Sequence, residues 1–240
     1  MKVLLIGYGK MGRTIEQILL DRGHTIAGIV DQSTKDKITD FTAEHVDVAI
    51  EFTQPTAAYE NITTALKQGL RVVSGTTGWL DRRAEVEALA SEGEAAFFYA
   101  SNFSLGVNIF FALNKKLAAM MNPHPQYTVS MEEIHHTEKL DEPSGTAITL
   151  AEGVIEEMNN IKGWYLSGGE GKKGEYVPIK ALREPEVPGT HSITYESEMD
   201  SIEIKHTAHT RKSFALGAVV AAEWLNGKRG VYGMQDMLEL

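Results

Sequence analysis

The chain has 240 residues, of which 42% are hydrophobic and 8% aromatic, and it contains no cysteine. This length suits one large domain or two modest ones, and the absence of cysteine excludes disulfides and cysteine nucleophiles. The net charge of −10 argues against general binding to nucleic acid or to an anionic membrane. The longest apolar runs are too short to span a bilayer, so we expect a cytoplasmic protein with small-molecule partners.

The first predicted elements are a strand, a glycine turn and a helix. Residues 2–6 form an apolar run typical of a buried strand, and the sequence GYGKMG follows before apolar residues at helical spacing. These glycines allow a tight turn and the close approach of a pyrophosphate at the helix N-terminus. A second strand over 25–30 ends in Asp31, whose carboxylate can bind ribose hydroxyls. The cofactor residues predicted from this dinucleotide-binding pattern are Gly7, Tyr8, Gly9, Lys10, Met11, Gly12 and Asp31.

Asp31 also bears on which nicotinamide cofactor is bound, because an acidic side chain at this place favours the free 2′-hydroxyl of NADH. The next residue is Gln32, so the arginine that often holds the 2′-phosphate of NADPH is missing there. Lys35 and Lys37 lie close enough in sequence to reach such a phosphate. We therefore expect NADH and keep NADPH as an alternative cofactor.

Strands and helices continue to alternate up to residue 103. Strands are predicted over 46–52, 70–74 and 95–99, with helices over 57–67 and 82–91, which indicates a parallel, doubly wound sheet. The carboxyl ends of such strands face the ligand crevice. By itself, the segment 75–78 is better explained as a turn. The further residues expected to line the cofactor crevice are Phe52, Gly75, Thr76, Thr77, Ala100, Ser101, Asn102 and Phe103.

Beyond residue 103 the pattern changes. Helices and strands become segregated, which predicts a second, smaller α+β domain with an open, mixed and mostly antiparallel sheet. The glycine-rich stretch 163–174 is expected to be a loop, and the helix 215–225 to pack back on the first domain. We therefore assign 1–105 and 213–240 to a Rossmann-like dinucleotide-binding domain, and 106–212 to a substrate-binding and oligomerisation domain. The other predicted elements are helices over 107–121 and from Ser144, and strands over 127–134, 176–181, 191–197 and 201–208.

The loop after the strand 127–134 carries the strongest functional signal in the second domain. His135 and His136 emerge at the strand end, and Ser144 is a good N-cap for the helix that follows Pro143. Gly145 and Thr146 then lie in the first helical turn, where free backbone N–H groups and the helix dipole favour a carboxylate. A histidine, which titrates near neutral pH, and the positive charge of Lys139 complete a site for an acidic small molecule.

The paired histidines have two other interpretations. One is structural, with one imidazole packed and the other solvated. The other is zinc, which is disfavoured because adjacent histidines at a strand end point to opposite faces and no cysteine completes a site. We expect no metal.

The segment Glu133-x-His-His-x-x-Lys-x-Asp-x-Pro-Ser-Gly-Thr-Ala147 resembles the signature of the dihydrodipicolinate reductase family. The similarity continues along the chain in the same order. It includes the glycine turn and the segments 47–53, 75–78, 101–108, 204–208 and 233–237.

The resemblance implies roles for individual residues: His135 and Lys139 would be catalytic, and His136, Gly145 and Thr146 would bind the substrate. It implies reduction of dehydrated 4-hydroxy-tetrahydrodipicolinate, a dicarboxylate, to tetrahydrodipicolinate by NADH or NADPH in diaminopimelate and lysine biosynthesis. It also implies a homotetramer. Two alternatives remain: a reductase acting on another acidic molecule, and a non-catalytic protein that senses NADH.

Overall fold

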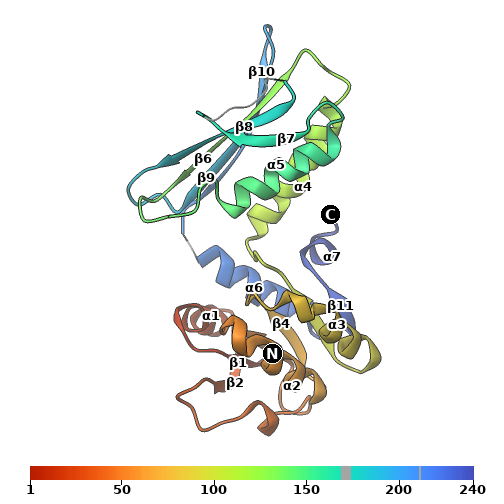
Figure 1. Cartoon of the computed structure of the whole chain (residues 1–240). Coiled ribbons are helices and arrows are strands. Elements are labelled where there is room, and N and C mark those ends of the chain that lie inside the picture. Colours follow the sequence, from red (N-terminus) through yellow and green to blue (C-terminus); the bar gives the residue numbers. More distant parts are fainter. Residues whose placement is uncertain (169–173, 211) are drawn as a thin grey trace. The chain divides into compact units, whose positions relative to one another are not determined.

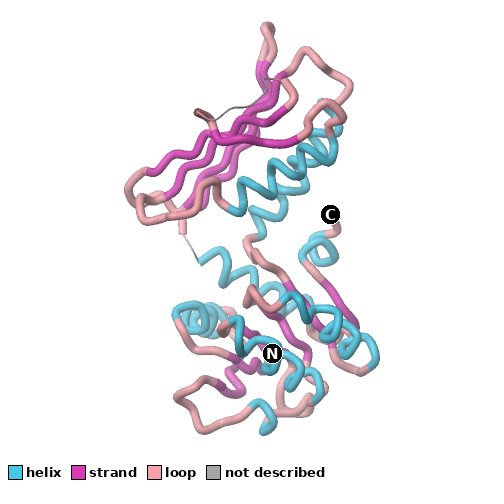
Figure 2. The backbone as a smooth tube through the Cα atoms, viewed as in Figure 1, coloured by secondary structure: helices cyan, strands magenta, loops and turns pink. Residues whose placement is uncertain are grey.

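The computed structural model describes residues 1–168, 174–210 and 212–240. The chain divides into one unit made of Met1–Leu105 and Lys212–Leu240 and a second unit made of Gly106–Arg211. Figure 1 labels most of the helices and strands of each unit, and Figure 2 shows helices, strands and loops by colour. In the part of the chain that the structure describes, no helix has the length and apolar character needed to cross a membrane.

The first unit is built on a six-stranded sheet in which every pairing is parallel, as predicted. The strand order is β11-β5-β4-β3-β1-β2, so the chain reverses its direction of growth between β1 and β3, where ligands of such sheets bind. The sequence patterns missed β11, which is only three residues long. The strands are β1 (Lys2–Ile6), β2 (Thr25–Val30), β3 (Val48–Glu51), β4 (Arg71–Ser74), β5 (Ala96–Tyr99) and β11 (Gly230–Tyr232).

Helices cover both faces of this sheet. Successive residues of each strand point to opposite sides, so every strand contributes side chains to two cores. On one face, Leu5 of β1 belongs to a core shared with α1 (Lys10–Asp21) and α6 (Lys212–Leu225). On the other face, Leu4 belongs to a core shared with α2 (Pro55–Lys67) and α3 (Arg83–Glu92). Three short elements complete the unit: η1 (Ile38–Asp40), η2 (Leu80–Arg82) and α7 (Met234–Leu238).

The second unit has a five-stranded mixed sheet in the order β10-β9-β6-β8-β7. Antiparallel pairs are half of the four pairings rather than most of them, because β6, β8 and β7 run parallel and α5 forms a crossover between them. The expected loop at 163–174 is also partly wrong, since its first four residues form β7, while 169–173 lie outside the described residues. The elements are α4 (Leu105–Met121), β6 (Thr128–His135), α5 (Gly145–Glu157), β7 (Gly163–Leu166), β8 (Tyr176–Arg183), β9 (Gly189–Glu196) and β10 (Ser201–Ala208).

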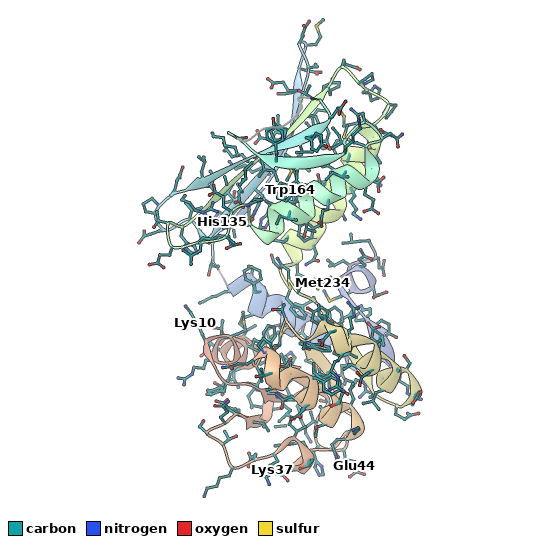
Figure 3. All side chains as sticks on the ribbon, in the orientation of Figure 1. Lys10, Lys37, Glu44, His135, Trp164 and Met234 are labelled. Carbon is teal, nitrogen blue, oxygen red and sulfur yellow. The ribbon has the colours of Figure 1, made fainter. Side chains whose placement is uncertain are left out.

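Strand β6 decides where the site of the second unit lies. Its residues alternate between exposed or half-buried and fully buried positions, and Val129 and Met131 pack in the core with α5. Because side chains alternate along a strand, Glu133 and His135 lie on this same helix-facing side. Both are buried at the carboxyl end of β6, and Figure 3 labels His135 there.

Candidate functional site

The first unit contains a cavity of about 480 Å³ at the reversal between β1 and β3. Its wall combines the glycine turn after β1, the end of β2 with Asp31, and the loop after β3 that leads into α2. A dinucleotide fits such a site, since its phosphates need a glycine turn at a helix N-terminus and its ribose needs an acidic side chain. The lining residues are Ile6, Gly7, Tyr8, Gly9, Val30, Asp31, Gln32, Phe52, Thr53, Gln54, Thr56, Ala57 and Asn61.

Two glycines of the turn are required by close backbone contacts. Gly7 has a φ of +93°, and a Cβ there would lie 2.1 Å from the carbonyl oxygen of Phe52. A Cβ on Gly12 would lie 2.3 Å from the carbonyl oxygen of Gly7. Any side chain at either position would push the turn out of place. At Gly9, by contrast, nothing lies within 4 Å of the Cβ position, so that side of the turn is open to a ligand.

A buried carboxylate connects the loops after β3 and β4. Glu51 is fully buried at the end of β3, and its Oε1 accepts hydrogen bonds from the Thr53 N–H at 3.0 Å and the Thr76 hydroxyl at 2.8 Å. The Thr53 hydroxyl also donates to Oε1, and the Ser74 hydroxyl donates to Oε2 at 2.6 Å. These donors satisfy the carboxylate without a cation. Glu51 therefore holds a wall of the cavity in place.

The structure gathers some of the predicted cofactor residues at this cavity and places others elsewhere. Gly7, Tyr8, Gly9, Asp31 and Phe52 line it, whereas Lys10, Met11 and Gly12 belong to the first turn of α1. The remaining candidates follow β4 and β5, farther along the sheet. Gln54, Thr56 and Asn61 also line the cavity and were not predicted from the sequence. The position of Gln54 and Thr56 could have been expected, because the first turn of a helix that follows β3 lies at the same crevice. The candidates that follow β4 and β5 are Gly75, Thr76, Thr77, Ala100, Ser101, Asn102 and Phe103.

In the second unit, the loop after His135 leads to the start of α5 as predicted. Ser144 is the N-cap, and its hydroxyl accepts the Ala147 N–H at 3.2 Å. Within the described residues, the Gly145 and Thr146 N–H groups have no hydrogen-bond partner, and nothing lies within 4 Å of the Cβ position on Gly145. This helix start is therefore free to bind a carboxylate.

Glu133 is the buried centre of the second site, and the sequence analysis gave it no role. Its two oxygens each lie 3.1 Å from the Ser144 nitrogen, and Oε2 lies 3.3 Å from His135 Nδ1. The Arg183 guanidinium lies 3.4 Å from Oε1. Burial opposes ionisation, yet the neighbouring His135 imidazole and the hydrogen bonding of Ser144 lower the pKa of Glu133 to about 2. Glu133 is therefore an anion that links the strand end to the helix start.

His191 on β9 is a second residue that sequence reasoning missed. Its ring packs edge-on against His135 with the centroids 5.0 Å apart, and its Nε2 lies 3.1 Å from the Ser144 hydroxyl. Burial lowers the pKa of His191 to about 4, and the neighbouring His135 acts in the same direction. His191 is therefore neutral at physiological pH. Its position could be found only from the β6–β9 pairing, in which Glu133 is opposite His191.

The ligand atoms of Glu133, His135 and His191 lie within 4.8 Å of one another, which is close enough for a metal ion. From the sequence, only His135 and His136 were candidate ligands for a metal ion. However, the Glu133 carboxylate already accepts the Ser144 N–H and faces the positive guanidinium of Arg183. A cation here would meet that charge, so the contacts favour a hydrogen-bonded network.

Lys139 is held by its own loop. Its ammonium donates to both oxygens of Asp141 at 2.8 Å, and this pairing lowers the pKa of Asp141. The Lys139 side chain is 21% exposed and that of Asp141 61%, so the pair is accessible to solvent. A substrate carboxylate can compete with Asp141 for the ammonium. His136 follows the last residue of β6 and is half-buried.

Both units of the chain have relatives among known proteins. Residues 1–103 match the family profile described as dihydrodipicolinate reductase, N-terminus, and residues 106–238 match the profile for the C-terminus of the same enzyme. A protein from Christiangramia forsetii named 4-hydroxy-tetrahydrodipicolinate reductase is 53% identical over 239 residues, which cover 99% of this chain and 98% of that protein. A protein of the same name from Methanoculleus marisnigri is 38% identical over 195 residues, covering 81% of this chain and 76% of that protein.

A solved structure has a similar fold. It is a dipicolinate-bound dihydrodipicolinate reductase from Paenisporosarcina sp. TG-14, with 23% identity, a TM-score of 0.76 and coverage of 98% of both chains. The predicted fold class, a Rossmann-like parallel sheet with a second mixed sheet, is therefore confirmed.

Proposed function

The chain belongs to the dihydrodipicolinate reductase family, and we propose that it reduces the dehydrated form of 4-hydroxy-tetrahydrodipicolinate to tetrahydrodipicolinate in diaminopimelate and lysine biosynthesis. The observation that carries this proposal is the second site. There, His135, Lys139 and the free amides of Gly145 and Thr146 belong to one strand, loop and helix start, the arrangement that an acidic substrate requires.

NADH or NADPH is the cofactor of this family, and its nicotinamide supplies the hydride when bound. In this chain, Gly7 and Gly9 would cradle the pyrophosphate at the start of α1, and Asp31 would bind the adenosine ribose. Phe52 and the residues after β4 and β5 are proposed to line the rest of the cofactor site, with Glu51 fixing the loops that carry Thr53 and Thr76.

We assign proton delivery to His135. Addition of a hydride to the conjugated carbon–carbon bond moves negative charge onto the ring nitrogen, which must then take up a proton. Glu133 and the His191 ring fix the His135 imidazole, so it can donate from a defined position. Lys139, His136 and the α5 amides are assigned to the substrate carboxylates, where Lys139 also offsets the developing negative charge.

The proposed function is tested by following the oxidation of NADH and of NADPH at equal concentrations with freshly generated 4-hydroxy-tetrahydrodipicolinate. Substrate-dependent oxidation with at least one cofactor is the expected result. Tight NADH binding without any turnover would favour a non-catalytic NADH sensor. Turnover with a different acidic substrate alone would favour another reductase.

We expect a higher kcat/KM with NADH than with NADPH, because the Asp31 carboxylate lines the cavity and Gln32 carries no positive charge. Replacing Asp31 with serine should reduce this preference by roughly tenfold, which corresponds to about 1.4 kcal/mol, because serine removes the carboxylate that repels a 2′-phosphate and accepts from the ribose hydroxyls. Steady-state kinetics with both cofactors measure the effect. An unchanged ratio in Asp31→Ser would show that Asp31 does not select the cofactor.

We also propose a homotetramer in the cytoplasm. In the second unit, α4 and α5 pack against one face of the sheet, whereas the other face contains a cavity of about 330 Å³ with polar walls, including Glu132, Lys180 and Glu203. The edge strand β10 is largely exposed, and Ile202 on it is 40% exposed. We propose that further copies of the chain bind through this face and stabilise the tetramer. Light scattering measures the mass of the assembly.

A further inference from the structure

We propose that Arg183 is a positioning residue of this reductase, whose guanidinium holds the loop that carries Lys139 against the buried carboxylate of Glu133. The inference rests on the proposed function, because it gives Lys139 its place beside the substrate. Arg183 lies outside the segment 133–147, and its contacts join distant parts of the chain.

Arg183 is the last residue of β8, and its place follows from the pairing of two parallel strands. The register sets Arg183 beside His135, and the N–H of Glu184 donates to the His135 carbonyl at 2.8 Å. The carboxyl ends of β6 and β8 therefore lie together. The Arg183 side chain is 19% exposed and extends from this point toward the loop after β6.

The guanidinium donates to backbone carbonyls of the loop and of β8, and it faces the Glu133 carboxylate on β6. Its Nε donates to the Lys139 carbonyl at 3.3 Å, and Nη2 donates to the Asp141 carbonyl at 2.7 Å. Nη1 donates to the Leu182 carbonyl at 2.8 Å, and both terminal nitrogens lie 3.4 Å from Glu133 Oε1. A planar fork with five N–H donors can make these bonds at the same time, whereas a lysine ammonium cannot span them.

The loop has few other means of staying in place. The hydrogen bonds from the Lys139 N–H to His136 and from its ammonium to Asp141 are internal to the segment 136–143. Leu140 is 96% exposed, so it contributes no apolar packing. Among the described residues, the two bonds from Arg183 are the hydrogen bonds that tie 137–143 to the rest of the unit. Pro143 is buried and fixes the far end of the loop.

Arg183 also couples the loop to the proposed proton donor. Its guanidinium faces Oε1 of Glu133, while Oε2 of the same carboxylate faces His135. One side chain thus places the backbone of Lys139 relative to the imidazole of His135. Without the Arg183 guanidinium, Lys139 and His135 would both still be present, but the loop would no longer hold Lys139 in its position. Misplacement of a catalytic group by about 1 Å can lower the rate by about 100-fold.

The test compares Arg183→Ala and Arg183→Lys with the control Lys162→Ala. Lys162 lies in the same unit, directly before β7, and forms an ion pair with Glu175 at 3.1 Å, but it contacts neither Glu133 nor the loop. We expect kcat to fall by about 100-fold in both Arg183 variants, because lysine keeps the charge but not the fork. The dissociation constant for NADH, which is bound by the other unit, should be unchanged, and Lys162→Ala should retain full turnover.

Two readouts separate positioning from mere stability. Hydrogen exchange of the amides in 137–143 should accelerate in both Arg183 variants and not in Lys162→Ala. Ethylguanidinium at millimolar concentration should restore a large part of the turnover of Arg183→Ala and leave that of Lys139→Ala unchanged.

Near-normal kcat in Arg183→Lys, or unchanged exchange of the loop in Arg183→Ala, would overturn the proposal. If Arg183→Ala does not fold, Arg183→Lys decides. If the wild-type chain shows no turnover, the proposed function fails, while the exchange experiment still decides whether Arg183 holds the loop.

Discussion

Replacing His135 with glutamine or Lys139 with alanine is expected to lower kcat by about 100-fold or more, the usual scale for loss of a positioned acid. Glutamine is close to the imidazole in size and is polar, but it cannot supply a proton. Alanine at 139 removes the ammonium that pairs with Asp141 in the free enzyme. Steady-state turnover at saturating NADH measures both effects.

Glu138→Ala is the matched control, because Glu138 is exposed on the same loop. Its turnover should equal that of the wild type, and NADH should bind all variants equally, since its proposed site is in the other unit. Near-normal turnover in both His135→Gln and Lys139→Ala would refute the catalytic assignment.

The second unit is expected to lose stability in acid in two stages. The unfolded chain binds a proton at His191 near pH 6.5, whereas the folded chain binds it only near pH 4, so acid favours unfolding across this interval. The shift corresponds to about 3 kcal/mol. Glu133 contributes at lower pH. The stability that comes from its depressed pKa is fully present above pH 4.5 and is lost as the pH falls through about 2. Unfolding of this unit should therefore begin well before the remaining carboxylates are protonated.

Urea unfolding between pH 7 and pH 4 checks the first stage when it is followed by fluorine NMR of 5-fluorotryptophan. Trp164 reports on the second unit (Figure 3), while Trp79 and Trp224 report on the first and serve as internal controls. The Trp164 transition should shift to lower urea as the pH falls, and His191→Asn should flatten this dependence. An equal dependence in His191→Asn would mean that another group binds the proton.

The first unit could be predicted almost completely from sequence, because its signals are local. Gly7, Gly12 and Asp31 lie within one strand, turn, helix and strand. Close backbone contacts require the two glycines, and Asp31 lines the cavity at the end of β2. The start of α5 at Gly145 was also predicted from local sequence, because Ser144 is a good N-cap residue directly after Pro143. The short strands β7 and β11 were missed because three or four residues beside glycines leave too little pattern.

The supporting residues of the second site could not be found in this way. Glu133 contacts Ser144, His191 and Arg183, which lie 11, 58 and 50 positions away, and the last two are set by the register of β6 with β9 and β8. A one-residue slip in either pairing would turn their side chains to the opposite face. No spacing in the sequence fixes such a register. The expected antiparallel majority was wrong for another reason, because β7 was expected to be part of a loop and its parallel pairing with β8 was therefore not counted.

The second unit is inserted into the first, and this has a consequence for synthesis of the chain. One of the two cores of the parallel sheet includes Ala215, Ala218 and Val219 of α6, which follow the whole of the second unit in sequence. A nascent chain that ends before residue 212 therefore exposes one apolar face of its nucleotide-binding sheet. The second unit has all its strands by residue 208 and can fold earlier, so here the N-terminal unit is the last to be completed.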